Sequence, residues 1–323
     1  MAKSVAIIGA GVSGLTTAIV FAERGWRTAI FAAETGAATN SAAAGAIWYP
    51  YDTAGDEALI SWALSSYREF VELSRQPGSG VSMIELRTFT RAGEIQIPAW
   101  AMALGGLRLQ PNECSFPSLR SQSSAPFTSG FALTVPVMDT TKYLPYLAER
   151  LLEAGGLIIG NSHVDQLEEV NREFALVINC AGIGARSLVP DTDLEPHRGQ
   201  VAIVLPFELP YAVVCDDPPL MYAIPRMNDC VFGGTNELSD NRVPDPEATS
   251  RIVAECSRVL NMSEPSVIAE RVGLRPFRKG GVCLRREQLH DGRLVIHNYG
   301  HGGSGFTLSW GCARNVLELA RGS

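Results

Sequence analysis

Near the N-terminus, glycines at positions 9, 11 and 14 separate a predicted strand from a predicted helix. The strand is the apolar run 4–8, and the helix shows apolar residues at helical spacing up to Ala22. A second predicted strand follows at 28–31, and Glu34 comes 20 residues after the last of the three glycines. This order of strand, glycine turn, helix, strand and acid strongly constrains the fold, because it begins a parallel α/β sheet.

Each glycine of this motif has a separate physical reason. Gly9 permits the tight turn, Gly11 lets the backbone approach a pyrophosphate, and Gly14 allows the helix to pack closely on the strand. The helix N-terminus favours an anion, and an acid after the second strand can accept hydrogen bonds from ribose hydroxyls. The motif predicts dinucleotide binding but does not separate NAD from FAD; a merely structural turn is the alternative. The expected contacts are Gly9, Gly11, Val12, Ser13, Gly14 and Glu34.

Further elements follow from apolar periodicity and from capping residues. A parallel α/β layer is predicted at the N-terminus, around 140–180 and at the end of the chain, with strand-rich stretches between these parts. Helices are expected at 57–73, 139–154, 249–260 and 308–320, and Pro145 is expected to mark the first turn of the second of these. Strands are expected at 157–159 and 174–179, with antiparallel strands in 198–234 and a pair of strands in 281–299. Residues 79–135 are expected to form strands and loops.

The predicted fold class is therefore α/β, with a Rossmann-like nucleotide-binding domain built from discontinuous segments and a strand-rich α+β second domain. The first domain is expected to comprise residues 1–51, 136–190 and 268–323. The second is expected to comprise residues 52–135 and 191–267.

Composition excludes several classes of function. The net charge of −7 argues against a nucleic-acid-binding face, and no apolar run reaches the roughly 18 residues of a membrane span. No cleavage site follows the N-terminal apolar run, so we expect a cytoplasmic protein. Seven scattered cysteines without a C-x-x-C motif predict free buried thiols and no metal site, with a Cys230–Cys283 pair as the alternative if their strands are neighbours.

Four later stretches carry the most specific signals. AGAIWYPY spans 44–51, RGQV spans 198–201, GLRP spans 273–276 and HNYGHGGSGFTLSWG spans 297–311. In this order, and together with the N-terminal motif, they resemble the D-amino-acid oxidase family along nearly the whole chain. The resemblance implies noncovalently bound FAD, a D-amino acid and O2 as substrates, no nucleic-acid or membrane partner, and association of two copies, although no residue marks an interface.

The implied reaction is oxidation of a D-amino acid by hydride transfer from Cα to flavin N5, giving an imino acid and hydrogen peroxide. Glycines near position 303 and the N-terminus of the last helix would bring backbone N–H groups to the flavin, where they stabilise negative charge on its reduced form. The hydroxyl of Thr307 could add a donor. The remaining FAD contacts that the resemblance implies are Thr39, Asn40, Ser41, Gly45, Ala46, Ile47, Val164, Ala181, Gly273, Gly302, Gly303, Gly305, Phe306 and Thr307.

The substrate is expected to be held by Arg275, whose planar guanidinium can bind a carboxylate through two parallel hydrogen bonds. By resemblance, the Tyr222 hydroxyl binds the same carboxylate and the Gly303 carbonyl accepts from the amine. Ser304 either contacts the substrate or faces solvent. Because neutral amines need no base for hydride departure, His301 is expected to have a structural, hydrogen-bonded role.

The stretch 215–221 before Tyr222 is short and holds no tyrosine, so any lid is expected to be small. Because Asp216 or Asp217 would repel an acidic side chain, we expect neutral, mainly apolar substrates, with Arg226 as the nearby cation that could overturn this expectation. The alternatives are a glycine or sarcosine oxidase, a D-aspartate oxidase, a nicotinamide-dependent dehydrogenase and a catalytically silent FAD-binding protein.

Overall fold

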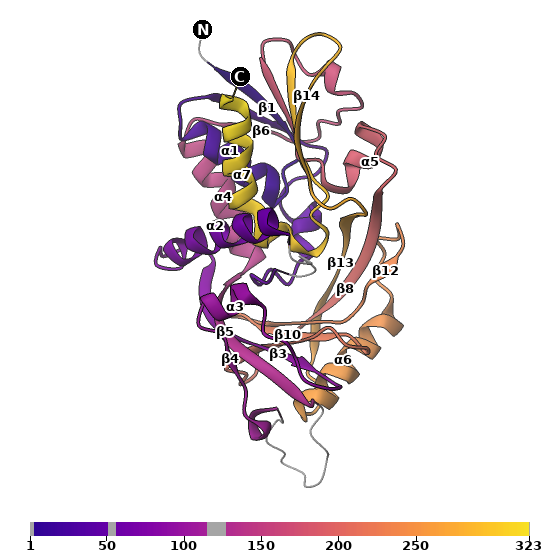
Figure 1. Cartoon of the computed structure of the whole chain (residues 1–323). Helices are drawn as coiled ribbons and strands as arrows, with labels where there is room; N and C mark the ends of the chain where they lie inside the picture. The colour runs from indigo at the N-terminus through magenta and orange to yellow at the C-terminus, as the bar shows by residue number, and fades with distance from the viewer. Residues whose placement is uncertain (1–2, 51–55, 115–126, 323) are drawn as a thin grey trace.

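The computed structural model describes residues 3–50, 56–114 and 127–322. Its two sheets lie one above the other along the long axis of the molecule, with both chain ends at the end formed by the smaller sheet (Figure 1). Tyr51, the last residue of AGAIWYPY and of the first predicted segment, lies outside the described residues.

The first sheet has six strands in the order β14-β15-β7-β1-β2-β6. All its neighbouring pairs are parallel except β14 with β15, which confirms the parallel α/β layer. The strands are β1 (Ser4–Ile8), β2 (Arg27–Phe31), β6 (Leu157–Ile159), β7 (Leu176–Asn179), β14 (Cys283–Gln288) and β15 (Leu294–Tyr299).

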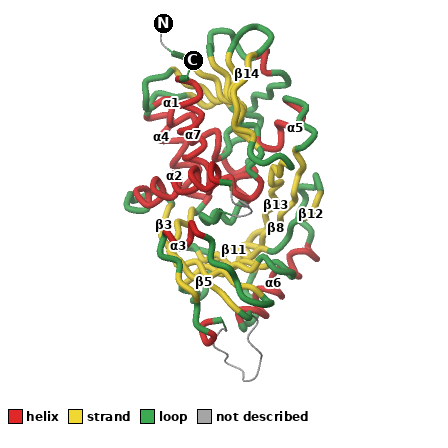
Figure 2. The backbone as a smooth tube through the Cα atoms, viewed as in Figure 1, coloured by secondary structure: helices red, strands yellow, loops and turns green. Residues whose placement is uncertain are grey.

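Burial on both faces explains why β1 is a continuous apolar run. Val5 and Ile7 point to a core shared with helices, whereas Ala6 and Ile8 point to a smaller cluster formed with the segment 164–174. The helices stand together beside the sheet (Figures 1 and 2) and are α1 (Val12–Ala22), α2 (Glu57–Leu73), α4 (Thr140–Glu153) and α7 (Gly305–Arg321).

The second sheet has nine strands, and among its pairs only β3 with β9 is parallel. Val201 and Ile203 point inward, toward the core shared with the first sheet, whereas Ala202 and Val204 pack on the side of α6 (Pro246–Leu260). The strands are β3 (Val81–Thr90), β4 (Leu107–Arg108), β5 (Ser129–Met138), β8 (Leu194–Val204), β9 (Tyr211–Cys215), β10 (Met221–Pro225), β11 (Cys230–Gly233), β12 (Glu237–Leu238) and β13 (Val267–Arg278).

Several details differ from the expectations. β13 pairs with β8 in the second sheet, although residues 268–278 were grouped with the first domain. The stretch 79–135 also holds a short helix, α3 (Ala99–Ala103), and α5 (Ala185–Leu188) follows β7. Pro145 lies beyond the first turn of α4, which begins one residue after its cap, Asp139.

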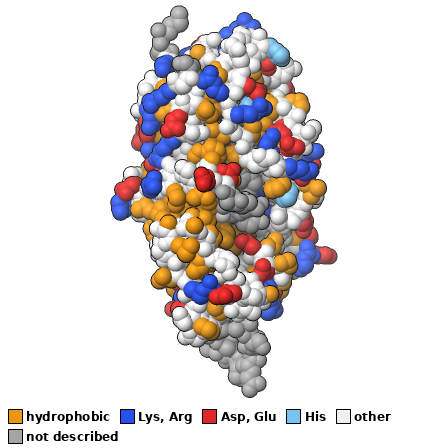
Figure 3. Space-filling view, viewed as in Figure 1, with side chains coloured by type: hydrophobic (Ala, Val, Ile, Leu, Met, Phe, Trp, Pro, Cys, Tyr) orange, Lys and Arg blue, Asp and Glu red, His pale blue; other side chains and the backbone are white. Residues whose placement is uncertain are grey.

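The seven cysteines agree with the expectation of free, buried thiols. All seven cysteines are buried and free; a Cys230–Cys283 pair is wrong, because β11 and β14 belong to different sheets. On the face seen in Figure 3, basic and acidic side chains are interspersed, and apolar side chains gather over α2. Among the helices that the structure describes, none has the length and apolar character needed to cross a membrane.

Candidate functional site

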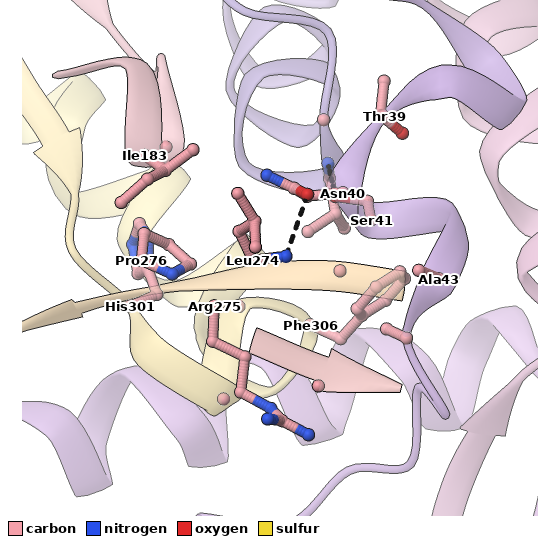
Figure 4. Close-up of a pocket in the computed structure, with 18 of the residues that line it drawn as sticks. Thr39, Asn40, Ser41, Ala43, Ile183, Leu274, Arg275, Pro276, His301 and Phe306 are labelled. Atoms are coloured by element: carbon pink, nitrogen blue, oxygen red, sulfur yellow. Dashed lines mark hydrogen bonds between the residues drawn. The ribbon is translucent and has the colours of Figure 1, made fainter. Parts of the chain in front are cut away.

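A cavity of about 570 Å³ lies where the two sheets meet. One side of it is formed by the segments that leave the carboxyl ends of β1, β2 and β7, which is where open parallel sheets bind ligands. The other side is formed by the inward face of the second sheet, with β13 running between the two (Figure 4). A cavity of this extent can take a ligand larger than a single amino acid.

The glycine turn after β1 has the geometry that its spacing predicts. Gly9 has a φ of +106°, and a Cβ atom there would lie 2.5 Å from the carbonyl oxygen of Cys180. A Cβ atom on Gly14 would overlap the carbonyl oxygen of Gly9, so α1 packs directly on the turn. Gly11 caps α1 without any side-chain hydrogen bond, and the Val12 N–H donates to Ser41 Oγ at 2.9 Å. The N-terminal end of α1 is thus open toward the cavity.

Glu34 follows β2 at the cavity wall and forms an ion pair that the sequence did not reveal. Its carboxylate accepts from Arg242 Nη1 at 2.6 Å. Arg242 itself lines the cavity, and its loop is held from behind by the buried Arg198, which donates to the carbonyls of Asn241 and Val243. The RGQV stretch therefore anchors the loop that reaches over to the first sheet.

The small residues before Trp48 form the next wall. Asn40 Oδ1 accepts from the N–H of Leu274 at 3.1 Å and joins this wall to β13 (Figure 4). A Cβ atom on Gly45 would lie 2.8 Å from Ile224 Cδ1 and 3.4 Å from the Tyr222 ring, so a side chain there would have to displace the end of Ile224.

The glycine-rich stretch before α7 lines the cavity with backbone. Gly300 and Gly302 have φ values of +80° and +53°, a left-handed backbone conformation that glycine adopts without steric cost. His301 is buried, with Nε2 hydrogen-bonded to Asn298 Oδ1 at 3.1 Å, and burial lowers its pKa to about 4. A neutral, bonded imidazole fits the structural role expected for this histidine.

Arg275 and Tyr222 meet at the end of the cavity formed by the second sheet. Arg275 leaves β13 on the side opposite Leu274 (Figure 4), and its Nη1 donates to the Thr235 carbonyl at 3.0 Å. Its guanidinium lies against Gly199, and its positive charge acts on the Tyr222 hydroxyl. Burial raises the pKa of Tyr222, and the nearby Arg275 charge opposes this shift. The tyrosine therefore stays protonated and can donate to an anion.

The two acids in the segment between β9 and β10, Asp216 and Asp217, have different surroundings. Asp216 lines the cavity, whereas Asp217 accepts from Thr90 Oγ1 at 2.5 Å and from the Arg91 N–H at 2.7 Å. Arg226 does not line the cavity; its buried guanidinium is bonded to Asp229. Arg226, the cation that could have paired with an acidic side chain of the substrate, is therefore bonded to Asp229 outside the cavity.

Most of the predicted site residues line this one cavity. Those that do are Gly9, Gly11, Val12, Ser13, Glu34, Thr39, Asn40, Ser41, Gly45, Ala46, Ile47, Val164, Ala181, Tyr222, Gly273, Arg275, Gly302, Gly303, Gly305 and Phe306. Gly14, Ser304 and Thr307 do not: Ser304 is buried, and the Thr307 hydroxyl donates to the carbonyl of Tyr49 and accepts from its N–H.

Several lining residues were missed. Gly199 is the glycine of the RGQV stretch, and its place within that motif was a signal that could have identified it. Arg242 and Thr235 carry no sequence signal, because their partners are far away along the chain. No group of three or more His, Cys, Asp or Glu side chains suited to a metal ion occurs among the described residues.

The chain is similar to known proteins over almost its whole length. A family model described as FAD dependent oxidoreductase matches residues 4–319. The D-amino-acid oxidase of Streptomyces coelicolor is 37% identical, covering 98% of this chain and 96% of its own. The D-amino-acid oxidase of Rubrobacter xylanophilus is also 37% identical, covering 97% and 94%. The crystal structure of glycine oxidase from Bacillus cereus has the same fold, with a TM-score of 0.80 at 18% identity, covering 99% of this chain and 95% of its own.

Proposed function

This chain belongs to the family of FAD-dependent oxidoreductases that includes the D-amino-acid oxidases, and we propose that it oxidises neutral, mainly apolar D-amino acids. The overall reaction converts the D-amino acid and O2 to an imino acid and hydrogen peroxide; water then hydrolyses the imino acid to a 2-oxo acid and ammonia. The observation that carries the proposal is the pairing of Arg275 with Tyr222 at one end of a cavity whose other end has a dinucleotide-binding turn.

The first-sheet side of the cavity fits FAD. The glycine turn leaves no Cβ between α1 and the cavity, which suits a pyrophosphate at the helix N-terminus, and Glu34 stands where ribose hydroxyls would lie. The small residues around Gly45 and the backbone around Gly303 suit the flat flavin ring. FAD, bound noncovalently, supplies the hydride acceptor at flavin N5 and passes the electrons to O2.

Arg275 and Tyr222 would fix the substrate by its carboxylate. With Nη1 held by the Thr235 carbonyl, the guanidinium has a set orientation and keeps further N–H groups for a carboxylate. The protonated Tyr222 donates to the same anion, and the Gly303 carbonyl accepts from the amine. Holding both groups sets the direction of Cα–H, and orientation of this kind supplies much of the rate.

No side chain has to act as a base in this scheme. His301 has a pKa of about 4 and its Nε2 is engaged by Asn298, so it is neutral and positions the glycine-rich backbone. The α-amine of the bound substrate is neutral when the hydride leaves Cα. The side-chain part of the cavity has apolar walls at Ile47, Val214 and Ile224, which suit neutral, apolar substrates, and the short 216–220 segment offers only a small lid.

Anaerobic mixing tests the proposal. We expect D-valine to bleach the flavin absorption band of the purified protein, and L-valine, D-aspartate and glycine to leave it unchanged. Bleaching by D-aspartate or by glycine instead would establish the corresponding alternative oxidase. A protein that retains flavin but responds to none of the four would be the catalytically silent alternative. Membership of the FAD-dependent family removes the nicotinamide-dependent alternative.

Three further points belong to the same proposal. We propose the two-domain division given above, with β13 joining the sheets. We also propose a cytoplasmic location, which the seven unpaired cysteines support. Cell fractionation tests the location, and analytical ultracentrifugation tests whether two copies associate as in the implied homodimer.

A further inference from the structure

Four described residues that line the cavity carry a formal charge, and three of them are accounted for. Glu34 and Arg242 form an ion pair with each other, and Arg275 contacts Tyr222 and the Thr235 carbonyl. Asp216 is different, because its carboxylate has no hydrogen bond or ion pair with any described residue. The side chain of Asp216 is exposed at the cavity wall, so its carboxylate is free to pair with a charged group of a ligand that enters the cavity.

The strand register places this carboxylate relative to Tyr222. Val214 lies directly opposite Tyr222 across the β9–β10 pair, and both belong to the inward face, whereas Val213 and Cys215 pack on the side of α6. Side chains two residues apart in a strand share a face, so the inward face continues from Val214 to Asp216. Two strand residues span roughly 7 Å, which is the order of length of an extended lysine or arginine side chain.

The neighbouring residue holds this orientation in place. Asp217 is bonded to the Thr90 hydroxyl and to the Arg91 N–H, both at the end of β3. Arg91 also donates to the Pro219 carbonyl, so the chain after Asp216 is held at two points, while Cys215 before it is paired with Phe89 in the sheet. Desolvation, and secondly the Asp217 carboxylate, raise the pKa of Asp216 to about 6, so it is largely ionised at neutral pH.

We infer that Asp216 determines specificity by accepting the cationic end of a long D-amino-acid side chain, so that D-arginine and D-lysine are substrates beside neutral D-amino acids. This assignment rests on the proposed function. With the substrate carboxylate at Arg275, the methylene stem packs against Val214 and Ile224, and the cation reaches Asp216 for a charge-assisted hydrogen bond. The same carboxylate disfavours D-aspartate and D-glutamate.

A second use of Asp216, binding the substrate's α-amine, agrees less well with the charges. The α-amine lies next to the carboxylate that Arg275 holds, so an acid serving it would lie beside Arg275. The Arg275 charge shifts the pKa of Tyr222, whereas the pKa of Asp216 responds to Asp217 and not to Arg275. The strand register, which places Asp216 two residues beyond the residue opposite Tyr222, favours the side-chain end of the substrate.

Isosteric substrate pairs test this assignment directly. D-arginine is compared with D-citrulline, and D-lysine with D-2-aminoheptanoate, which has a methyl group in place of the ammonium, because only the cationic member of each pair should use Asp216. For Asp216→Asn, we expect kcat/KM for D-arginine to fall about tenfold, mainly through KM, while D-citrulline changes less than about twofold. Asp216→Glu should keep most of the preference, and Glu153→Gln, which removes an exposed charge at the end of α4, should change neither ratio.

The possible failures are distinguishable. An unchanged D-arginine to D-citrulline ratio in Asp216→Asn would overturn the assignment while leaving the proposed function intact. An equal loss for all substrates, with flavin content and melting temperature as in the wild type, would also overturn it and would assign Asp216 to the α-amine. If neutral D-amino acids fail to reduce the flavin of the wild-type protein, the proposed function is refuted, and the assignment of Asp216 with it.

Discussion

Gly199→Ala tests whether Arg275 must sit where the structure places it. A Cβ atom on Gly199 would lie 2.5 Å from Arg275 Cζ and closer still to both Nη atoms, whereas ordinary contact begins at 3.4 Å. The clash meets only the end of a flexible side chain, so the guanidinium yields by about 1 Å and β8 need not change. The substitution thus moves the substrate-binding group without deleting it.

The magnitude follows from this displacement. A misplacement of about 1 Å in a group that orients the substrate can cost about 100-fold in rate, so kcat/KM for D-valine should fall by about that factor. The free energy of unfolding should change by less than about 1 kcal/mol, because alanine is tolerated in strands and no backbone has to move. Flavin content should stay at the wild-type level, because Gly199 meets the guanidinium and not the glycine turn.

The assay combines steady-state kinetics with binding of isovalerate, which has the carbon skeleton of valine without the amine. Perturbation of the flavin spectrum gives its Kd, which should rise in parallel with the loss of kcat/KM. Gly160→Ala is the matched control, since its Cβ atom would meet no neighbour closer than 3.4 Å and Gly160 does not line the cavity. Wild-type kinetics and isovalerate affinity in Gly199→Ala would refute the role given to Arg275.

Three other perturbations test the rest of the site. Gly14→Ala should abolish FAD binding and cost more than about 2 kcal/mol of unfolding free energy, measured by urea titration, because its Cβ atom overlaps the backbone oxygen of Gly9, which cannot move aside. Glu34→Gln should weaken FAD binding about tenfold in a fluorescence titration of the apoprotein, through loss of a charged acceptor for ribose; unchanged affinity would remove Glu34 from the site. Burial holds the folded-state pKa of His301 at about 4, below its unfolded value near 6.5, so the neutral imidazole contributes stability that is present above pH 6.5 and is lost as pH falls toward 4. Unfolding free energies of the wild type should fall by up to about 3 kcal/mol more than those of His301→Gln across that window, and parallel curves would contradict the shift.

Sequence reasoning succeeded where the determining contacts are local. The packing of Gly14 on the carbonyl of Gly9 involves residues five apart, so spacing alone predicts this contact. The helix 57–73 was found with its bounds because its cap and its apolar stripe are contiguous. The start of α7 was missed by three residues, because Gly305 and Phe306 are helical in the structure although the glycines before them suggest a loop.

The failures come from partners that lie far apart in the chain. The Thr307 hydroxyl bonds the backbone of Tyr49, 258 residues away, a contact that the sequence does not reveal. Arg242 meets Glu34 over a separation of 208 residues, and nothing in its own neighbourhood marks it. Arg226, by contrast, has a partner only three residues away, Asp229. The sequence alone could therefore have suggested that Arg226 pairs with Asp229 and not with a ligand.

The same sheet face that builds the core also sets the chemistry of the cavity. Along β9 and β10, alternate side chains point either to α6 or inward, and the inward set passes from core residues such as Ile224 to Tyr222 and then, beyond Val214, to Asp216. A one-residue slip in this pairing would turn the Tyr222 side chain toward α6 and the Met221 side chain inward. The register that buries the apolar residues therefore also fixes which charges a substrate meets, and substitutions in the α6 core that loosen this register should reduce substrate discrimination before they remove flavin.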